Sequence, residues 1–187
     1  DDGPLGVRWT SMERTQKAVL ELDGTRGLSP PNAFRVVLPP AGPESEDVRR
    51  QGRLKKVFEG PIEKLRCSFA IRIEQTNADS DYLHLTLANE AGEKYALWMD
   101  VSGADTVVYL NDVKAPPRIR GFGEDWTTVD VEITPETYAL RYDGAEVHAA
   151  PISRAAPFAS VTMLLGLMTY EDSGATALYD DVVCEVQ

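Results

Sequence analysis

The chain has 187 residues, of which 43% are hydrophobic and 26% are charged, so its composition is globular and excludes wholesale disorder. The formal net charge is -11, which argues against binding nucleic acid or an anionic membrane through a general electrostatic field. The longest apolar run, residues 161–168, is too short to span a bilayer.

Short segments that alternate apolar and polar residues follow one another and are separated by Gly, Pro, Asn and Asp. This pattern is typical of β-strands joined by turns, and helical periodicity is almost absent. The expected strands are 17–22, 33–38, 54–59, 66–75, 82–88, 94–101, 106–110, 126–133, 138–142, 145–149, 161–168 and 176–186. So many strands need two packed sheets, so we expect a single all-β domain over residues 1–187, a sandwich of two antiparallel sheets.

Two segments are expected to be long loops. Residues 39–52 are rich in proline and mixed charges, and residues 111–125 contain Pro116 and Pro117 beside Arg118 and Arg120. Long loops on a β-sandwich are frequent places for binding residues, so these two segments are candidates to border a site.

The register of one hairpin follows from the sequence. Residues 82–101 hold two alternating strands around Glu90-Ala91-Gly92, and Gly92 supplies the left-handed conformation that a three-residue loop requires. The predicted pairs on the apolar face are Leu87 with Tyr95, Leu85 with Leu97, and Leu83 with Met99. A slip of one residue would place apolar side chains opposite polar ones, so burial selects this register.

The other face of the same hairpin is polar and aromatic. The register places Tyr82 opposite Asp100 and His84 opposite Trp98, with Lys94 at the end of the second strand. Sugars stack on Trp and Tyr rings while polar neighbours bind their hydroxyl groups. This face is therefore a candidate carbohydrate site, formed by Tyr82, His84, Trp98 and Asp100 and bordered by Arg118 and Arg120. The alternative is that Trp98 is covered by a loop and serves packing alone.

Two further hairpins follow in the second half of the chain. The first pairs Val131 with Leu140 around a four-residue loop at 134–137. The second turns at Asp143-Gly144, a strong hairpin signal, and is predicted to pair Leu140 with Val147. Both hairpins are interpreted as structural.

Four short segments carry a resemblance to a known superfamily. They are WTTVDV at 126–131, LRYDG at 140–144, LGL at 165–167 and LYDDV at 178–182. Their order resembles the second half of concanavalin A-like lectin/glucanase domains, which include laminin G-like domains, over roughly residue 57 to the C-terminus. The resemblance implies a jelly-roll sandwich whose concave sheet face is a common carbohydrate site. The superfamily includes lectins, glucanases, lyases and adhesion domains, so the fold alone does not define an activity.

The enzyme branches of this superfamily match poorly. The glucanase branch carries Glu-x-Asp-x-x-Glu on one strand, and here Thr128 and Ile133 stand at the outer two positions around Asp130. The lyase branch carries Gln-x-His, and here Tyr82 precedes Leu83 and His84. The sequence therefore favours a domain without catalytic residues.

The function predicted from the sequence is a non-catalytic extracellular domain that binds carbohydrate on the concave sheet face. One alternative is a structural or adhesion domain of a surface protein with no small ligand. A second alternative is a glycan-cleaving enzyme with an unrecognised site. The expected partner is a glycan or cell-surface polysaccharide, without nucleic acid or membrane insertion, and the oligomeric state stays open.

No cofactor is expected from the sequence. Asn77, Asp79 and Asp81 alternate oxygen ligands as at the start of a Ca²⁺ loop, but Tyr82 and Ala88 stand where an EF-hand needs Gly and Glu. A solvated turn is the simpler interpretation. Asp180, with Glu171 and Asp172, is a second weak calcium candidate.

Cys67 and Cys184 lie far apart in sequence. Alternation places both on the apolar side of their strands, and in the resembling fold the C-terminal strand lies beside strands from the first half of the chain. The pair is thus a candidate disulfide, the alternative being two separate buried thiols. The chain begins with Asp1, so we expect a processed product whose signal peptide was removed, in keeping with an extracellular or cell-envelope location.

Overall fold

The computed structural model is all-β and describes residues 9–15, 17–28, 33–40, 49–76, 80–102, 105–110, 113–114, 119–120, 122, 125–152, 157–170 and 174–187. Its strands are β1 (Ser11–Arg14), β2 (Val19–Asp23), β3 (Ala33–Leu38), β4 (Arg50–Ile62), β5 (Leu65–Thr76), β6 (Ser80–Ala88), β7 (Lys94–Ser102), β8 (Asp105–Leu110), β9 (Val113–Lys114), β10 (Ile119–Arg120), β11 (Thr127–Ile133), β12 (Thr137–Tyr142), β13 (Ala145–Pro151), β14 (Phe158–Thr169) and β15 (Ala175–Val186). No helix in these residues is long and apolar enough to cross a membrane.

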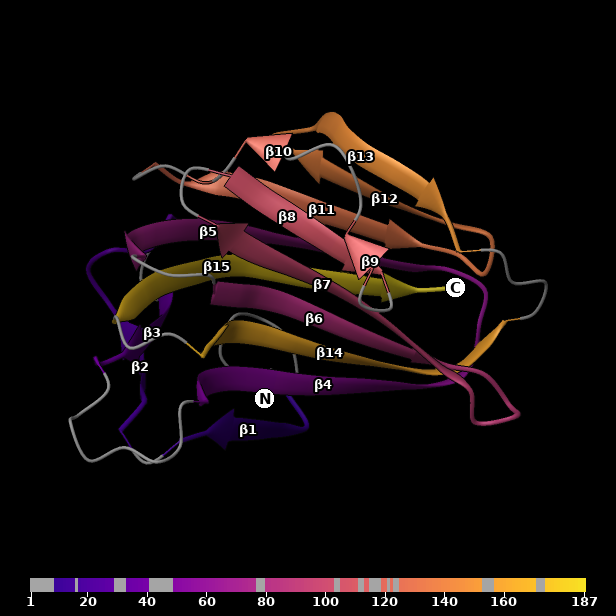
Figure 1. Cartoon of the computed structure of the whole chain (residues 1–187), viewed down its shortest axis with the longest axis horizontal. Helices are drawn as coiled ribbons and strands as arrows, with labels where there is room; N and C mark the ends of the chain where they lie inside the picture. The colour runs from indigo at the N-terminus through magenta and orange to yellow at the C-terminus, as the bar shows by residue number, and fades with distance from the viewer. Residues whose placement is uncertain are drawn as a thin grey trace.

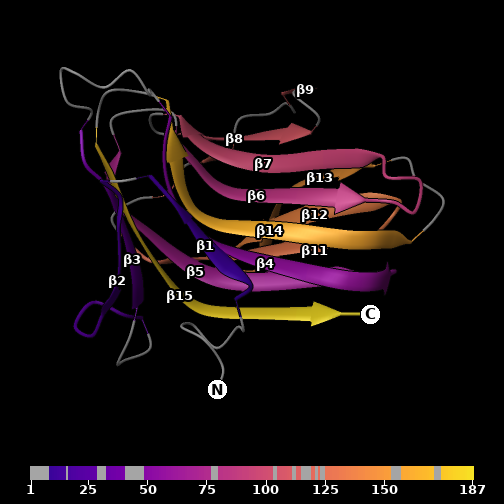
Figure 2. The same ribbon diagram turned by 90° about the horizontal axis from the view of Figure 1, so that it is seen from below.

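The strands form two antiparallel sheets, which confirms the predicted jelly-roll sandwich. The eight-stranded sheet has the order β1-β4-β14-β6-β7-β8-β10, with β9 paired to β8. The seven-stranded sheet has the order β13-β12-β11-β5-β15-β3-β2. Strands β4, β14, β6 and β7 lie side by side in one layer (Figures 1 and 2). Neighbours such as β4 and β14 are distant in sequence, so the sheet brings residues from both halves of the chain onto one face.

Burial of alternating apolar residues between the sheets produces this arrangement. Leu83, Leu85 and Leu87 of β6 are almost fully buried and pair with Met99, Leu97 and Tyr95 of β7, as predicted. The facing sheet buries Phe69, Ile71, Val129 and Val131 in the same way. With the apolar side chains inward, the alternate residues of β6 and β7 lie on the outward face of the eight-stranded sheet.

A β-bulge changes the predicted face of Tyr82. The β6–β7 register shifts between Asp81 and Leu83, so Asp81 rather than Tyr82 pairs with Asp100. Tyr82 is 0% exposed, and its hydroxyl group lies 3.1 Å from the Tyr142 hydroxyl in the core. The extra residue of a bulge cannot be inferred from simple alternation, and this is why the prediction of Tyr82 on the polar face was wrong.

Three other expectations need correction. A second bulge shifts the β12–β13 register, so Leu140 pairs with His148 and not with Val147. Strand β4 begins at Arg50, inside the segment 39–52 that was predicted to be a loop. The predicted loop 111–125 contains the two-residue strands β9 and β10, which pair with β8.

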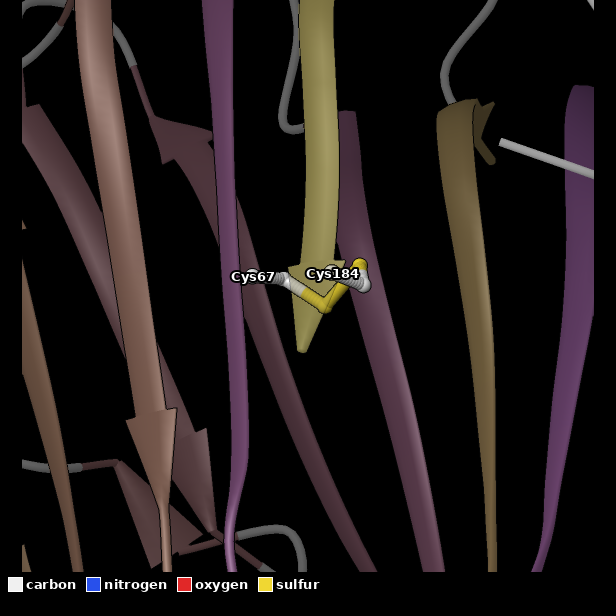
Figure 3. The surroundings of a disulfide bond; sticks show 2 residues. All are labelled: Cys67 and Cys184. Atoms are coloured by element: carbon white, nitrogen blue, oxygen red, sulfur yellow. A yellow bond between two sulfur atoms is a disulfide. The ribbon is translucent and has the colours of Figure 1, made fainter. Parts of the chain in front are cut away.

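A disulfide joins Cys67 of β5 to Cys184 of β15 (Figure 3). The two residues are direct partners in the register of these neighbouring strands, with Cα atoms 4.2 Å apart. Cys67 is buried, whereas Cys184, near the exposed end of β15, is only partly buried. The bond links residues 117 apart in sequence and fastens the C-terminal strand to the centre of its sheet.

Replacing Leu85 by alanine should destabilise the fold by about 2–5 kcal/mol, through lost transfer free energy and the cavity left behind. Leu85 is 1% exposed and packs at the centre of β6. Urea unfolding of the Leu85→Ala variant measures the change. Thr86→Ala, on the outward face of the same strand, is the matched control and should cost less than about 1 kcal/mol. Equal losses in the two variants would contradict the assignment of faces.

Stability should fall as the pH drops because of His148. Burial lowers the pKa of His148 below its ordinary value of 6.5, and its Nε2 lies 2.9 Å from the Tyr138 hydroxyl oxygen. The unfolded chain therefore takes up a proton at a higher pH than the folded protein does. This contribution to stability is present above the ordinary pKa of about 6.5 and is lost as the pH falls from there through the lowered pKa of the folded state. Urea unfolding between pH 7.5 and pH 5 should show a steeper pH dependence for the wild type than for His148→Gln; equal slopes would contradict the prediction.

Candidate active site

A row of half-buried side chains crosses the outward face of the eight-stranded sheet. The row follows the register of five neighbouring strands, β4, β14, β6, β7 and β8, and consists of Lys55, Leu164, His84, Trp98 and Tyr109. Partners in an antiparallel register point to the same side of the sheet, so all five side chains share one face. Neighbouring strands are spaced by roughly 4.8 Å, so the row spans about 19 Å. That length suits several sugar rings of a polysaccharide.

Three aromatic rings of this row stack on one another. His84 and Trp98 have ring centroids 5.7 Å apart with planes 11° from parallel. Trp98 and Tyr109 have centroids 5.2 Å apart with planes 10° from parallel. Stacking against Trp98 fixes the plane of the imidazole ring. An imidazole on this face can exchange a proton with a bound ligand.

A buried ion pair lies next to His84 on the same sheet. The Arg53 guanidinium donates to Oδ2 of Asp81 at 2.8 Å, and Nδ1 of His84 lies 3.6 Å from that same oxygen. Arg53 is 1% exposed and Asp81 is 5% exposed. The β6 bulge turns Asp81 toward this position, and Gly166 of β14, which has φ 142°, lets the backbone of β4 approach closely.

The structure brings together only part of the predicted carbohydrate site. His84 and Trp98 are neighbours on the outward face, and Asp100 lies half-buried one pair further along β7. Tyr82 is absent from this face because it is buried in the core. Arg120 pairs with Asp105 in the backbone register of β10 and β8, and Arg118 lies outside the described residues.

The calcium candidates do not come together in the described part of the chain. Asp79 lies outside the described residues, as do Glu171 and Asp172. Asp81 is paired with Arg53 in one sheet, whereas Asp180 is buried in the other. Within the described ranges, no group of three or more His, Cys, Asp or Glu residues could hold a metal ion.

Asp81 and Asp100 face each other across β6 and β7, which raises the question of a hydrolytic pair. A glycosidase needs one carboxylic acid that can donate a proton to the leaving oxygen. Asp81 is instead buried and already engaged by the guanidinium of Arg53 at 2.8 Å. The geometry therefore does not favour acid-assisted hydrolysis by this pair.

Sequence reasoning missed Lys55, Arg53, Asp81 and Tyr109 as neighbours of His84. Tyr109 was within a predicted strand, and the register of β7 with β8 would have placed it beside Trp98. Lys55 and Arg53 belong to β4, which reaches His84 only through β14. No local signal in the sequence pairs these strands, so their contribution could not be derived from hairpin registers.

Comparison with solved structures reveals the relatives of this fold. Neither a family model nor a curated protein matches the sequence. An endo-β-1,4-glucuronan lyase from the fungus Trichoderma reesei superposes with a TM-score of 0.75 at 11% identity, over 96% of this chain and 91% of that one. The protein shares its fold with this lyase. The cellulose-induced protein Cip1 gives a TM-score of 0.71 at 12% identity, over 95% of this chain and 90% of that one. Alginate lyase A1-II′ of polysaccharide lyase family 7 gives 0.67 at 9% identity, over 94% and 85%.

These comparisons correct the function predicted from the sequence. The leading interpretation, a non-catalytic carbohydrate-binding domain, was wrong, because the solved structures that match nearly the whole chain include glycan-cleaving enzymes. The second alternative, a glycan-cleaving enzyme, agrees better with them. The error arose because the departure from Gln-x-His at Tyr82 was taken as a lost site, although His84 itself lies on the outward face.

Proposed function

We propose that the protein is a polysaccharide lyase that cleaves a uronate-containing glycan on the outward face of its eight-stranded sheet. The observation that carries the proposal is the position of His84. Its half-buried imidazole stacks on Trp98, and it lies in a row of side chains that has Lys55 at one end and Tyr109 at the other. The similar solved structures support the choice of reaction, since they include lyases named for glucuronan and alginate, and one alginate lyase variant is bound to its substrate.

The reaction is a β-elimination. A base removes the proton on the carbon next to the uronate carboxylate, the bond from the neighbouring carbon to the glycosidic oxygen breaks, and a carbon–carbon double bond forms. The departing oxygen takes up a proton, so no water is consumed. Such a reaction needs a base and a positive charge that stabilises the developing negative charge on the carboxylate.

His84 is proposed to take this proton and then to deliver it to the departing oxygen. Lys55 is proposed to face the carboxylate, because it is the cation of the same row and lies two strand spacings, about 10 Å, from His84. The Lys55 ammonium also lies 3.6 Å from Glu13 of the neighbouring edge strand β1. The stack of Trp98 and Tyr109 is proposed to contact the next sugar.

The Cys67–Cys184 disulfide supports an oxidising compartment, as does a polymeric glycan substrate, so we propose that the protein acts outside the cytoplasm. The proposed partner is thus an extracellular or cell-wall polysaccharide.

Substitution of His84 tests the proposed function. Purified wild-type protein is mixed with glucuronan, alginate and a neutral glucan, and the ultraviolet absorbance of the conjugated unsaturated uronate is followed. We expect a signal with a uronate polymer, and a loss of about 10²–10⁴-fold in kcat for His84→Asn. His148→Asn, the other histidine of the chain, is the matched control and should keep full activity. Activity that survives in His84→Asn would contradict the role of His84.

A further inference from the structure

The buried pair of Arg53 and Asp81 has a position that packing alone does not explain. Both side chains are nine-tenths or more buried, and the pair lies against the one histidine of the outward row. Burying two charges costs several kcal/mol per ion, and apolar residues of similar volume often replace such pairs without loss of stability. A pair retained in this position therefore calls for a role beyond stability.

Arg53 cannot itself bind a substrate carboxylate, because it is 1% exposed and its guanidinium is already engaged by Asp81 at 2.8 Å. Its position depends on Gly166, since a Cβ atom at residue 166 would lie 2.8 Å from the Arg53 Cα. The close approach of β14 thus fixes the backbone of Arg53, and the Arg53 side chain holds the Asp81 carboxylate in place.

Asp81 has acceptor capacity left for His84. Its Oδ2 receives the Arg53 donor, whereas its buried Oδ1 has no hydrogen-bond partner among the described residues. The distance of 3.6 Å from Nδ1 of His84 to Oδ2 exceeds a hydrogen bond, and a small side-chain rotation closes it. Such contacts are often long without substrate and tighten when it binds.

We infer that Asp81 is a positioning residue that holds the Nδ1–H tautomer of His84, while Arg53 orients Asp81. The catalytic benefit of this arrangement rests on the proposed function, whereas the assigned tautomer rests on the geometry of the side chains alone. The aromatic stack with Trp98 fixes the plane of the imidazole ring, and the carboxylate determines which nitrogen carries the proton. Nε2 then faces the substrate with its lone pair, ready to take a proton.

Nitrogen NMR of the histidine side chains tests the inference without any substrate. The chain has two histidines, so spectra of His148→Asn assign the signals of His84. We expect neutral His84 to be in the Nδ1–H form in the wild type, and to become a mixture of tautomers in Asp81→Asn. The signals of His148, which contacts Tyr138, should stay unchanged and serve as the internal control. An Nε2–H tautomer in the wild type would overturn the inference.

A second variant separates the loss of the Asp81 carboxylate from misfolding. Asp81→Asn leaves the Arg53 charge buried without its partner, so Arg53→Met/Asp81→Leu removes both charges together. Circular dichroism confirms that each variant is folded, and the double variant should show the same mixed tautomers. With an active substrate, Asp81→Asn should lower kcat by about 10²-fold or more and leave KM nearly unchanged, because Asp81 does not touch the substrate. An unchanged tautomer in both folded variants would refute the inference, whereas a wild type inactive on every glycan would refute only the proposed function.

Discussion

Removal of the disulfide should cost the folded state about 4–5 kcal/mol, because the bond closes a loop of more than a hundred residues in the unfolded chain. The partners Cys67 and Cys184 are 117 positions apart and join β5 to β15 in the centre of the seven-stranded sheet. For a chain of this size, the loss corresponds to a drop in Tm of roughly 10–20 °C. Thermal unfolding of Cys67→Ala/Cys184→Ala measures it.

Reduction supplies the control for this prediction. Dithiothreitol should lower the Tm of the wild type toward that of the double variant and leave the double variant unchanged. Thiol titration of the denatured, unreduced wild type should find no free thiol. Two free thiols per chain would contradict the bond and weaken the proposal of an extracellular location with it.

Gly166→Ala should destabilise the protein by about 3 kcal/mol or more, and should disturb the site as well. Gly166 has φ 142°, a conformation that L residues rarely adopt, and a Cβ atom there would collide with the backbone of Gly52 and Arg53. Backbone strain and overpacking each contribute about 1–3 kcal/mol. Urea unfolding gives the total change.

Gly92→Ala is the matched control for Gly166→Ala. Gly92 also has a positive φ, 78°, but nothing lies within 4 Å of a Cβ atom built on it. Its substitution should cost about 1–2 kcal/mol through conformation alone. The excess loss in Gly166→Ala measures the close approach of β4 to β14. Similar losses of unfolding free energy in the two variants would show that β4 and β14 do not approach closely at Gly166.

The sequence was sufficient to predict the sandwich and the local hairpin registers. Alternation in residues 82–101 predicted which residues of β6 and β7 are buried, and Leu85 and Leu97 pair as expected. The same rule failed at Tyr82, because a β-bulge adds one residue to β6. Beyond the bulge, the side chains that simple alternation places outward point inward. Bulges have no reliable local signature, so the exchange of Tyr82 for Asp81 on the outward face could be found only in the structure.

The site itself was predictable in part. His84 and Trp98 come from one hairpin, and their pairing follows from its turn. Lys55 and Arg53 come from β4, which is placed beside β6 only by the insertion of β14 from the far end of the chain. Pairings between strands that are distant in sequence depend on the whole fold, so the basic residues near His84 could not be derived from local patterns.

This assembly from distant strands explains why the sequence did not favour a glycan-cleaving enzyme. The Gln-x-His motif of the lyase branch lies on a single strand, and β6 has His84 but no glutamine two residues before it. On the outward face, however, the imidazole of His84 has a buried carboxylate on its own strand, an aromatic neighbour on β7 and an ammonium two strands away on β4. The proposed functional residues are therefore recognised by their row across the sheet rather than by their order in the chain.

The mass of the products formed from a uronate polysaccharide tests the central claim most directly. The purified protein is incubated with glucuronan and with alginate, and the released oligosaccharides are analysed by mass spectrometry beside those from His84→Asn. Elimination consumes no water, so the account predicts fragments that are one water molecule lighter than hydrolysis products and carry an unsaturated end, and it predicts their loss in His84→Asn. Release of fragments without any unsaturated product, or unsaturated fragments formed equally well by His84→Asn, would contradict it.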